Sequence, residues 1–427
     1  MQNFQDLTLE PTLASAISAG GFTTLTPIQA QAIPLALNGD DILGIAQTGT
    51  GKTLAFGVPI IQAALLHPGK PMSKTVKALI LAPTRELVNQ IAMTLSTMTK
   101  KTNLRVSAVV GGASLGKQLK ILSRGTDILV ATPGRLIDLL ERGGVDLSIT
   151  RHLVLDEADQ MLDIGFIHAL RRIVPYLNEK RQTMLFSATM SKPMESLSRT
   201  YLTNPKRVQV SSPNVTADLV DQSVQFVEKA KKPFQLFKIL QDHTSTATLI
   251  FSRTKHGAEK LKNSLVSDGY KATSIHGNKT QGQRDRAIKS FRSGQVDILV
   301  ATDVAARGID IPTVGLVINY DLPNVAENYV HRIGRTARAG RSGKAISFCA
   351  SDEYKYLKDI EKLIKTRIMT IGDVPHRAPE ETKSSPQRKN GTKKKRFNPR
   401  DKVKHSQKSR NGQRYRRGKS RPNKTAA

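Results

Sequence analysis

Two short stretches hold residues whose types and spacing suit phosphate chemistry. The first is GIAQTGTGKTLAF, in which Gly49 and Gly51 precede Lys52 and Thr53. Glycines in such a turn let backbone amides point at phosphate oxygens, a lysine there reaches the β- and γ-phosphates, and the hydroxyl binds magnesium. The usual pattern begins with glycine, where this chain has Ala46. The stretch predicts a phosphate-binding loop, and a chance glycine loop is the alternative.

The second stretch, LVLDEADQMLD, gathers acidic residues in a chain whose net charge is +31. Its LVL run predicts a buried strand with Asp156 at the carboxyl end. A carboxylate in that place holds magnesium in phosphate-loop enzymes, and Glu157 is placed to orient and deprotonate the attacking water. The alternative is a helix start enriched in acids, which the helix dipole favours. The glycine loop upstream favours the magnesium site.

The scaffold that must position these stretches is indicated by runs that recur in both halves of the chain. Four short apolar runs, each ending in a polar turn, return in the same order. The pairs are TDILVATPGR (126–135) with VDILVATDVA (296–305), ALILAPTR (78–85) with ATLIFSRT (247–254), LVLDEAD (153–159) with LVINYDLP (316–323), and MLFSAT (184–189) with ISFCAS (346–351). Such runs are typical of buried parallel strands.

Helical patterns separate these runs, as at 86–98 and 256–269. Strands that alternate with helices predict an α/β fold with a doubly wound parallel sheet, and two copies predict two similar domains. The boundary is expected near 205–220, where Pro, Ser and Asn cluster. Ligands of such sheets bind beyond the carboxyl ends of the strands, so chemistry is expected where the polar turns lie.

With AQTGTGKT and DEAD in this order, residues 1–370 resemble the DEAD-box RNA helicases of superfamily 2. The resemblance implies two tandem RecA-like domains at 1–208 and 222–372, a linker at 209–221 and a basic tail at 373–427. It implies an RNA-stimulated ATPase that uses ATP and Mg²⁺ and unwinds short duplexes locally when its domains close. Details such as FSRTKHGAEKL are most similar to the bacterial RhlE-type subgroup, which implies ribosome maturation or RNA turnover.

The resemblance also assigns roles to individual residues. Adenine would contact Phe4 and Gln29, and the ribose would contact Asp310. The phosphates would be held by Ala46, Gln47, Thr48, Gly49, Thr50, Gly51, Lys52 and Thr53, and the magnesium ion by Thr53 and Asp156. Catalysis would use Lys52, Asp156 and Glu157 together with His331, Arg335 and Arg338. Asp159 would couple hydrolysis to closure through Ser187, Ala188 and Thr189.

A third group of residues would contact RNA. By resemblance these are Pro83, Thr84, Arg85, Gly112, Thr132, Pro133, Gly134, Arg135, Arg253, Gly277, Gln281, Arg284 and Thr302. Arginines, threonines and glycine amides suit phosphates and 2′-hydroxyls rather than base edges. The chain has no Trp and few aromatic residues, so we expect binding to structured or duplex RNA without sequence specificity.

The last 52 residues, 376–427, hold 19 Lys or Arg, 3 acids and six apolar residues. This composition predicts a disordered arm that binds nucleic acid, with a solubility or membrane-surface role as the alternative. No signal peptide or membrane span is indicated, so a cytoplasmic monomer is expected, with pre-ribosomal particles or RNA-decay proteins as possible partners. The single cysteine, Cys349, lies in an apolar run and is expected to be a buried structural thiol.

Two other functions stay open at this stage. One is a DNA translocase of the same architecture, which RNA-selective stimulation of ATP hydrolysis would exclude. The other is a non-catalytic RNA-binding or annealing protein with a vestigial ATP site. Intact Lys52, Glu157, Arg335 and Arg338 disfavour this second alternative.

Overall fold

The computed structural model describes residues 2–47, 49–210, 220–243, 247–306, 314–337 and 343–372. Most of the predicted linker and all of the predicted tail lie outside these ranges. Three predicted site residues, Thr48, Asp310 and Arg338, also lie outside them.

The described residues up to 210 form one parallel sheet of seven strands in the order β3-β4-β2-β5-β6-β1-β7. The strands are β1 (Ile42–Ile45), β2 (Val76–Leu81), β3 (Val106–Val109), β4 (Thr126–Ala131), β5 (His152–Leu155), β6 (Gln182–Ser187) and β7 (Lys206–Gln209). The helices are η1 (Phe4–Asp6), α1 (Pro11–Ala19), α2 (Pro27–Leu37), α3 (Lys52–Leu66), α4 (Arg85–Met98), α5 (Leu115–Leu122), α6 (Pro133–Glu141), α7 (Ala158–Asp163), α8 (Ile167–Ile173), η2 (Val174–Tyr176) and α9 (Lys192–Tyr201).

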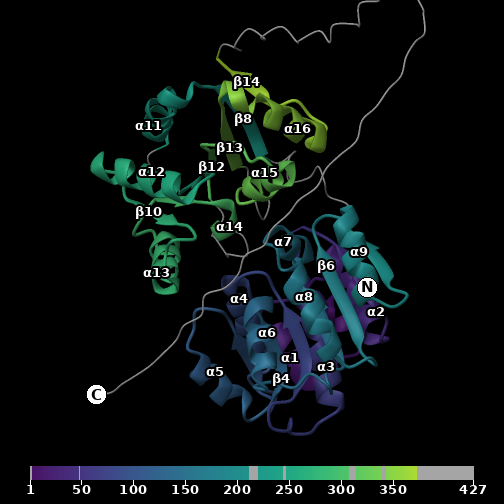
Figure 1. Ribbon diagram of the computed structural model, residues 1–427. Coiled ribbons are helices and arrows are strands. Elements are labelled where there is room, and N and C mark those ends of the chain that lie inside the picture. The colour runs from purple at the N-terminus through teal and green to yellow at the C-terminus, as the bar shows by residue number, and fades with distance from the viewer. Residues whose placement is uncertain are drawn as a thin grey trace, which may run out of the picture. The chain divides into compact units, whose positions relative to one another are not determined.

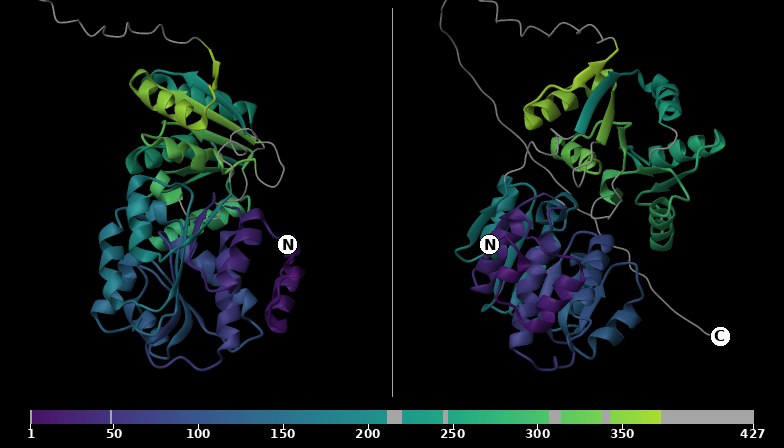
Figure 2. Two further views of the ribbon diagram at one scale, coloured as in Figure 1. Left: turned by 90° about the vertical axis from the view of Figure 1, so that its right-hand side faces the viewer. Right: turned by 180° about the vertical axis from the view of Figure 1, so that it is seen from behind.

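Helices cover both faces of this first sheet (Figure 2). Alternate side chains of one strand point to opposite faces, so Ile128 and Val130 of β4 pack with α1 to α4, whereas Leu129 and Ala131 pack with α5 to α9. Each face therefore has its own apolar core. This explains why the strands are continuous apolar runs in the sequence rather than alternating ones.

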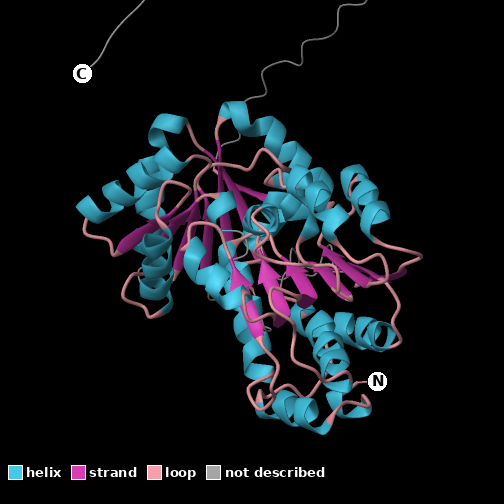
Figure 3. Ribbon diagram, turned by 60° about the horizontal axis from the view of Figure 1, so that its bottom comes forward, coloured by secondary structure: helices cyan, strands magenta, loops and turns pink. Residues whose placement is uncertain are grey.

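The described residues from 220 onward repeat the arrangement, as the labels of Figure 1 and the magenta strands of Figure 3 show. Seven parallel strands form a second sheet in the order β10-β11-β9-β12-β13-β8-β14. They are β8 (Val220–Phe226), β9 (Thr248–Phe251), β10 (Ala272–Ile275), β11 (Ile298–Ala301), β12 (Leu316–Asn319), β13 (Gly343–Cys349) and β14 (Met369–Ile371). The helices are η3 (Lys229–Lys231), α11 (Lys232–Asp242), α12 (Lys255–Ser267), α13 (Gln281–Arg292), α14 (Asp303–Ala306), α15 (Ala326–Ile333), η4 (Ser351–Glu353) and α16 (Tyr354–Ile364).

The recurring runs of the sequence occupy equivalent places in the two sheets. In the first sheet the positions of β2, β4, β5 and β6 match those of β9, β11, β12 and β13 in the second sheet. All four predicted pairs are therefore confirmed. The predicted helices at 86–98 and 256–269 are α4 and α12, and each begins at a threonine whose hydroxyl accepts a hydrogen bond from the first-turn backbone. Cys349 is buried as expected, and burial raises the pKa of its thiol to about 12.

Strand order also explains why distant motifs meet. β5, β6 and β1 are neighbours, and because all three are parallel, their carboxyl ends lie at one edge of the sheet. The acidic turn (156–159) follows β5, the SAT segment (187–189) begins at the last residue of β6, and the glycine loop (46–51) follows β1. Among the described residues, no helix has the length and apolarity that crossing a bilayer requires.

Candidate functional site

The glycine loop joins β1 to α3 with a backbone that only glycine adopts easily. Gly49 and Gly51 have φ values of 87° and 88°. A Cβ at Gly51 would lie 2.5 Å from the side-chain nitrogen of Gln29, so a larger residue would displace that side chain. Lys52 begins α3, and its ammonium donates a hydrogen bond to the Ala46 carbonyl at 3.0 Å. The lysine therefore spans the loop in which phosphates would bind.

Gln29, the predicted adenine contact, braces this loop. Its side-chain carbonyl accepts from the Thr26 amide at 2.9 Å, and its side-chain nitrogen donates to the Gly51 carbonyl at 2.9 Å. Phe4, the predicted stacking residue, is 5% exposed at the edge of the apolar core, and its amide donates to the Thr23 carbonyl. The two residues are thus held by local structure, and their contacts with adenine remain a prediction.

The acidic turn is buried, which is unusual for carboxylates. Asp156 and Glu157 are 2% and 3% exposed, and Glu157 has a left-handed backbone with φ of 51°. Burial raises the pKa of both carboxyl groups, whereas the nearby ammonium of Lys52 lowers both pKa values. Strained, buried acids of this kind are common at functional sites. The helix-start alternative does not explain this burial, since exposed acids would serve a helix dipole equally well.

The third acid of the turn links two of the loops. One oxygen of Asp159 accepts from the amides of Ala188 and Thr189 at 3.0 Å each and from the Thr189 hydroxyl at 3.2 Å. Its other oxygen accepts from the Gln160 amide. The Ser187 carbonyl accepts from the Ala46 amide at 2.9 Å. Acidic turn, SAT segment and glycine loop are therefore one hydrogen-bonded unit.

The residues present fit a magnesium ion. Mg²⁺ takes oxygen ligands, often one or two carboxylates with waters and substrate phosphates. Asp156 is a buried carboxylate whose charged form burial disfavours, so a nearby divalent cation would offset that cost. Thr53, the second residue of α3, supplies a hydroxyl beside the glycine loop.

The predicted RNA contacts of the first half gather at the carboxyl ends of β2, β3 and β4. Thr84 and Thr132 are the N-cap residues of α4 and α6. The guanidinium of Arg85 lies against Gly112, where a Cβ would be 2.1 Å from it, and Arg135 donates to the Ala113 carbonyl at 3.1 Å. Pro83, Pro133 and Gly134 lie in the same turns. The guanidinium groups of Arg85 and Arg135 thus lie beside the Gly112 loop, and such groups suit a phosphate-binding surface.

The predicted RNA contacts of the second half are less uniform. Gln281 and Arg284 lie on the first turn of α13, where both contact the carboxylate of Glu86, at 2.9 Å and 3.1 Å. Gly277 and Thr302 follow β10 and β11. The guanidinium of Arg253 is instead engaged by the Glu353 carboxylate and the Leu322 carbonyl. Its predicted RNA contact would have to use its remaining donors.

The basic residues between 331 and 335 include one structural residue and two candidate catalytic ones. Arg332 is 1% exposed and forms a bidentate pair with Asp303 at 2.6 and 2.7 Å, so it stabilises the second core. Arg335 follows α15 and is also buried, and His331 is half-buried on that helix. The catalytic roles of Arg335 and His331 remain predictions.

Sequence reasoning missed two groups of side chains. Glu86 directly follows Arg85 in the sequence, but nothing in the sequence indicates that its carboxylate contacts α13. The buried ammonium of Lys232 forms ion pairs with Glu353 at 2.8 Å and Asp321 at 3.2 Å. An isolated KKP segment gives no signal for this pairing, which depends on acids about 90 to 120 residues away in the chain.

Comparisons with known proteins agree with this geometry. A DEAD/DEAH box helicase family model matches residues 26–197, and a helicase conserved C-terminal domain model matches residues 231–340. The chain is 42% identical to DEAD-box ATP-dependent RNA helicase 30 of Arabidopsis thaliana, covering 86% of this chain and 62% of the relative. It is 43% identical to the ATP-dependent rRNA helicase rrp3 of Aspergillus fumigatus, covering 93% and 86%.

The fold is also similar to a solved structure. S. cerevisiae Dbp5 bound to RNA and ADP BeF3 matches with a TM-score of 0.76 and 32% identity, over 87% of this chain and 96% of that chain. Both halves of the chain thus have counterparts in one group of enzymes. This chain belongs to the DEAD-box ATP-dependent RNA helicases.

Proposed function

We propose that the site formed by Lys52, Asp156 and Glu157 hydrolyses ATP, and that the chain couples this reaction to local, non-processive opening of RNA duplexes. One observation carries the proposal. The glycine loop, the acidic turn and the SAT segment follow three neighbouring parallel strands and are joined by the hydrogen bonds of Asp159 and Ala46. A change at the γ-phosphate can therefore reach the SAT segment through direct contacts.

In this proposal each residue has a separate task. Lys52 leaves the Ala46 carbonyl to bind the β- and γ-phosphates. Glu157 takes a proton from the attacking water, a task that suits a carboxylate whose pKa is raised by burial. Asp156 and Thr53 hold Mg²⁺, which when bound neutralises charge on the phosphates. Arg335 and Arg338 stabilise the charge that develops on the transferred phosphoryl group.

RNA would bind along the loops that present Arg85, Gly112 and Arg135, with Gln281 and Arg284 on α13 completing the surface. The pairing of Glu86 with those two residues supports this, because it fixes their side chains beside Arg85, whose guanidinium also donates to Gln281 at 3.4 Å. If RNA and ATP favour the same arrangement, each raises the affinity for the other. The basic segment 373–427 would add salt-sensitive affinity for phosphates.

Structured ribosomal RNA precursors are the proposed target class. The relative named rrp3 supports this, since it is an rRNA helicase in its own name and covers 93% of this chain. An RhlE-type place within the family, a cytoplasmic location, a monomeric state and contacts with pre-ribosomal or RNA-decay proteins belong to the same proposal and rest on the sequence motifs.

The test compares ATP hydrolysis by the full chain alone, with duplex RNA and with duplex DNA of the same sequence. RNA-selective stimulation is expected, and Lys52→Ala should abolish it. Equal stimulation by DNA would instead support a translocase. Unchanged hydrolysis in the Lys52→Ala variant would remove the glycine loop from the reaction.

A further inference from the structure

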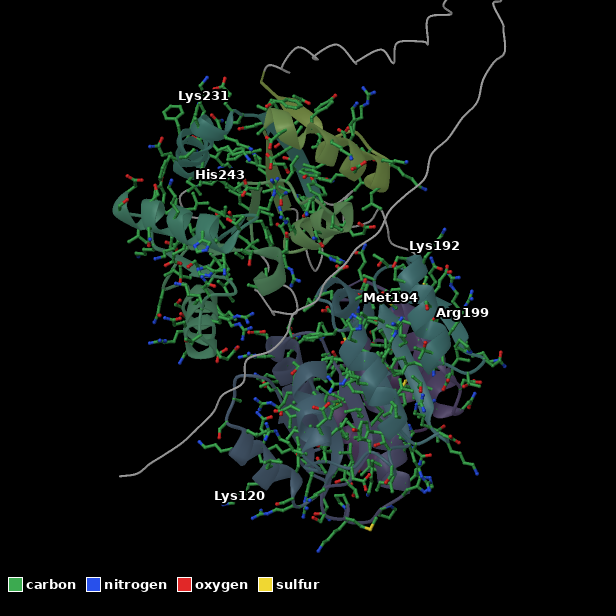
Figure 4. The ribbon with its side chains drawn as sticks, viewed as in Figure 1. Lys120, Lys192, Met194, Arg199, Lys231 and His243 are labelled. Carbon is green, nitrogen blue, oxygen red and sulfur yellow. The ribbon has the colours of Figure 1, made fainter. Side chains whose placement is uncertain are left out.

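A basic groove lies at the outer edge of the first sheet, away from the loops already described. It lies between the C-terminal end of α4 and the helix α5, beside the edge strand β3, and has a volume of about 770 Å³. Its charged lining residues are Lys100, Arg105, Lys117, Lys120 and Arg124, and no acidic residue lines it. Figure 4 labels Lys120 on this side of the sheet.

The spacing on α5 concentrates this charge on one face. Lys117, Lys120 and Ile121 follow one another at intervals of three and one residues, which places them on the same side of α5, and Arg124 lies in the turn after that helix. Across the groove, Ser96 lies in the last turn of α4, and Thr99 and Lys100 follow directly after that helix. Two elements thus present a polar, cationic surface to one shared groove.

These cations are not neutralised by the fold. Among the described residues, none of the five basic side chains forms an ion pair, and all five are exposed. Asp127, whose carboxylate accepts from the Arg105 amide at 2.9 Å, is 2% exposed and is also paired with Lys77 at 2.8 Å. Several like charges in one concave surface repel each other, so a bound polyanion would relieve this repulsion.

Helix α5 connects the proposed RNA surface to the groove. Gly112 and Ala113, which contact Arg85 and Arg135, are followed at once by α5. This helix is about 12 Å long at 1.5 Å per residue, and its basic face extends away from the Gly112 loop. We propose that the groove holds the backbone of an RNA segment flanking the part held by the Arg85, Gly112 and Arg135 loops. This role of the groove rests on the proposed RNA-binding function.

The lining favours RNA over an acidic protein segment. A docked helix needs apolar anchors at regular spacing, and the only strongly exposed large apolar side chain in the groove is Ile121. No aromatic side chain lines the groove, so bases would not be stacked or read there. Lysines, arginines and hydroxyls suit phosphates and riboses of any sequence.

The test compares full-chain variants in binding a short RNA of about 8 nucleotides and a long one of about 25 nucleotides. Lys117→Gln, Lys120→Gln and Arg124→Gln are combined in the groove variant. The control variant combines Lys192→Gln, Arg199→Gln and Lys206→Gln, which remove the same charge at the opposite edge of the sheet, where Figure 4 labels Lys192 and Arg199. Both variants keep the basic tail.

The groove variant should bind the short RNA as the unchanged chain does and the long RNA at least tenfold more weakly at about 0.1 M salt. For the long RNA, the steepness with which the logarithm of the binding constant falls with the logarithm of salt concentration should decrease by about 2. Each lost phosphate contact removes about 0.7 from this slope. The control variant should change neither value. The proposal would be overturned if the groove and control variants lost equal affinity for the long RNA, or if the groove variant lost equal affinity for both RNAs. Intact RNA binding with lost binding of polyglutamate would overturn it in favour of an acidic protein partner.

Failure of the proposed RNA contacts would look different. A variant with Arg85→Gln and Arg135→Gln should lose affinity for both RNAs. If it keeps the short RNA while the groove variant loses the long one, the contacts at Arg85 and Arg135 are wrong and the groove stands.

Discussion

Replacing Asp159 by Asn should separate ATP hydrolysis from duplex opening. The Asp159 carboxylate accepts three hydrogen bonds from Ala188 and Thr189 and a fourth from Gln160. An amide supplies one oxygen only, so whichever way it turns, its NH₂ group faces a backbone N–H donor. Hydrogen bonds to a charged acceptor contribute about 1.5–3 kcal/mol and neutral ones about 1 kcal/mol. Losing the charge on three bonds therefore costs about 3 kcal/mol.

Two measurements check this reasoning. A loss of about 3 kcal/mol in a domain of this size lowers the melting temperature by roughly 10 °C. ATP hydrolysis with RNA should stay within several-fold of the unchanged chain, because Asp156, Glu157 and Lys52 are retained, whereas duplex opening per ATP should fall at least tenfold. Glu179→Gln is the matched control, since Glu179 is an exposed acid in the same half of the chain. The reasoning is refuted if both variants have the same melting temperature and open duplexes equally well.

Three further changes test other parts of the structure. Glu157→Gln should slow hydrolysis at least about 100-fold while complexes with ATP and RNA accumulate, as single-turnover kinetics would show; a normal rate would exclude Glu157 as the base. Gly51→Ala should weaken ATP binding at least about tenfold in calorimetry, whereas Gly39→Ala, which has the same backbone φ but no atom within 4 Å of an added Cβ, should leave it unchanged. Burial raises the pKa of Asp321, but the Arg253 amide and the Lys232 ammonium outweigh burial and hold this pKa below its ordinary value. The stability that Asp321 contributes is thus present at neutral pH and is lost as pH falls below about 4, so melting temperatures of Asp321→Asn should depend less on acid pH than those of the unchanged chain.

The strand pairs were predictable because both faces of each sheet are covered. A strand buried on both sides must be apolar throughout, so runs such as ALIL and DILV are visible in the sequence without any structure. The order of the strands in the sheet was not predictable in this way. No local pattern indicates that β5, β6 and β1 are neighbours, and that adjacency is what brings Asp159 to the SAT segment.

The candidate site shows the same division. Gly51 was predictable because its conformation is a local property of the loop. The ion pairs of Lys232, Arg332 and Glu86 were not, because each joins residues far apart in the chain and depends on burial. Arg253 illustrates the risk of assigning roles by motif alone, since its guanidinium already pairs with Glu353.

The repeated strand order has a consequence for stoichiometry. The second sheet has β8 in the place of β1, yet the chain continues from β8 into VEKAKKP, which contains no glycine loop. The sheet is duplicated, but the glycine loop that would bind phosphates occurs once in the sequence. One chain should therefore consume a single ATP per cycle, and the length of duplex opened in each cycle is limited by the free energy of that one hydrolysis. Longer duplexes would have to be opened by repeated rebinding or by several chains acting on one RNA.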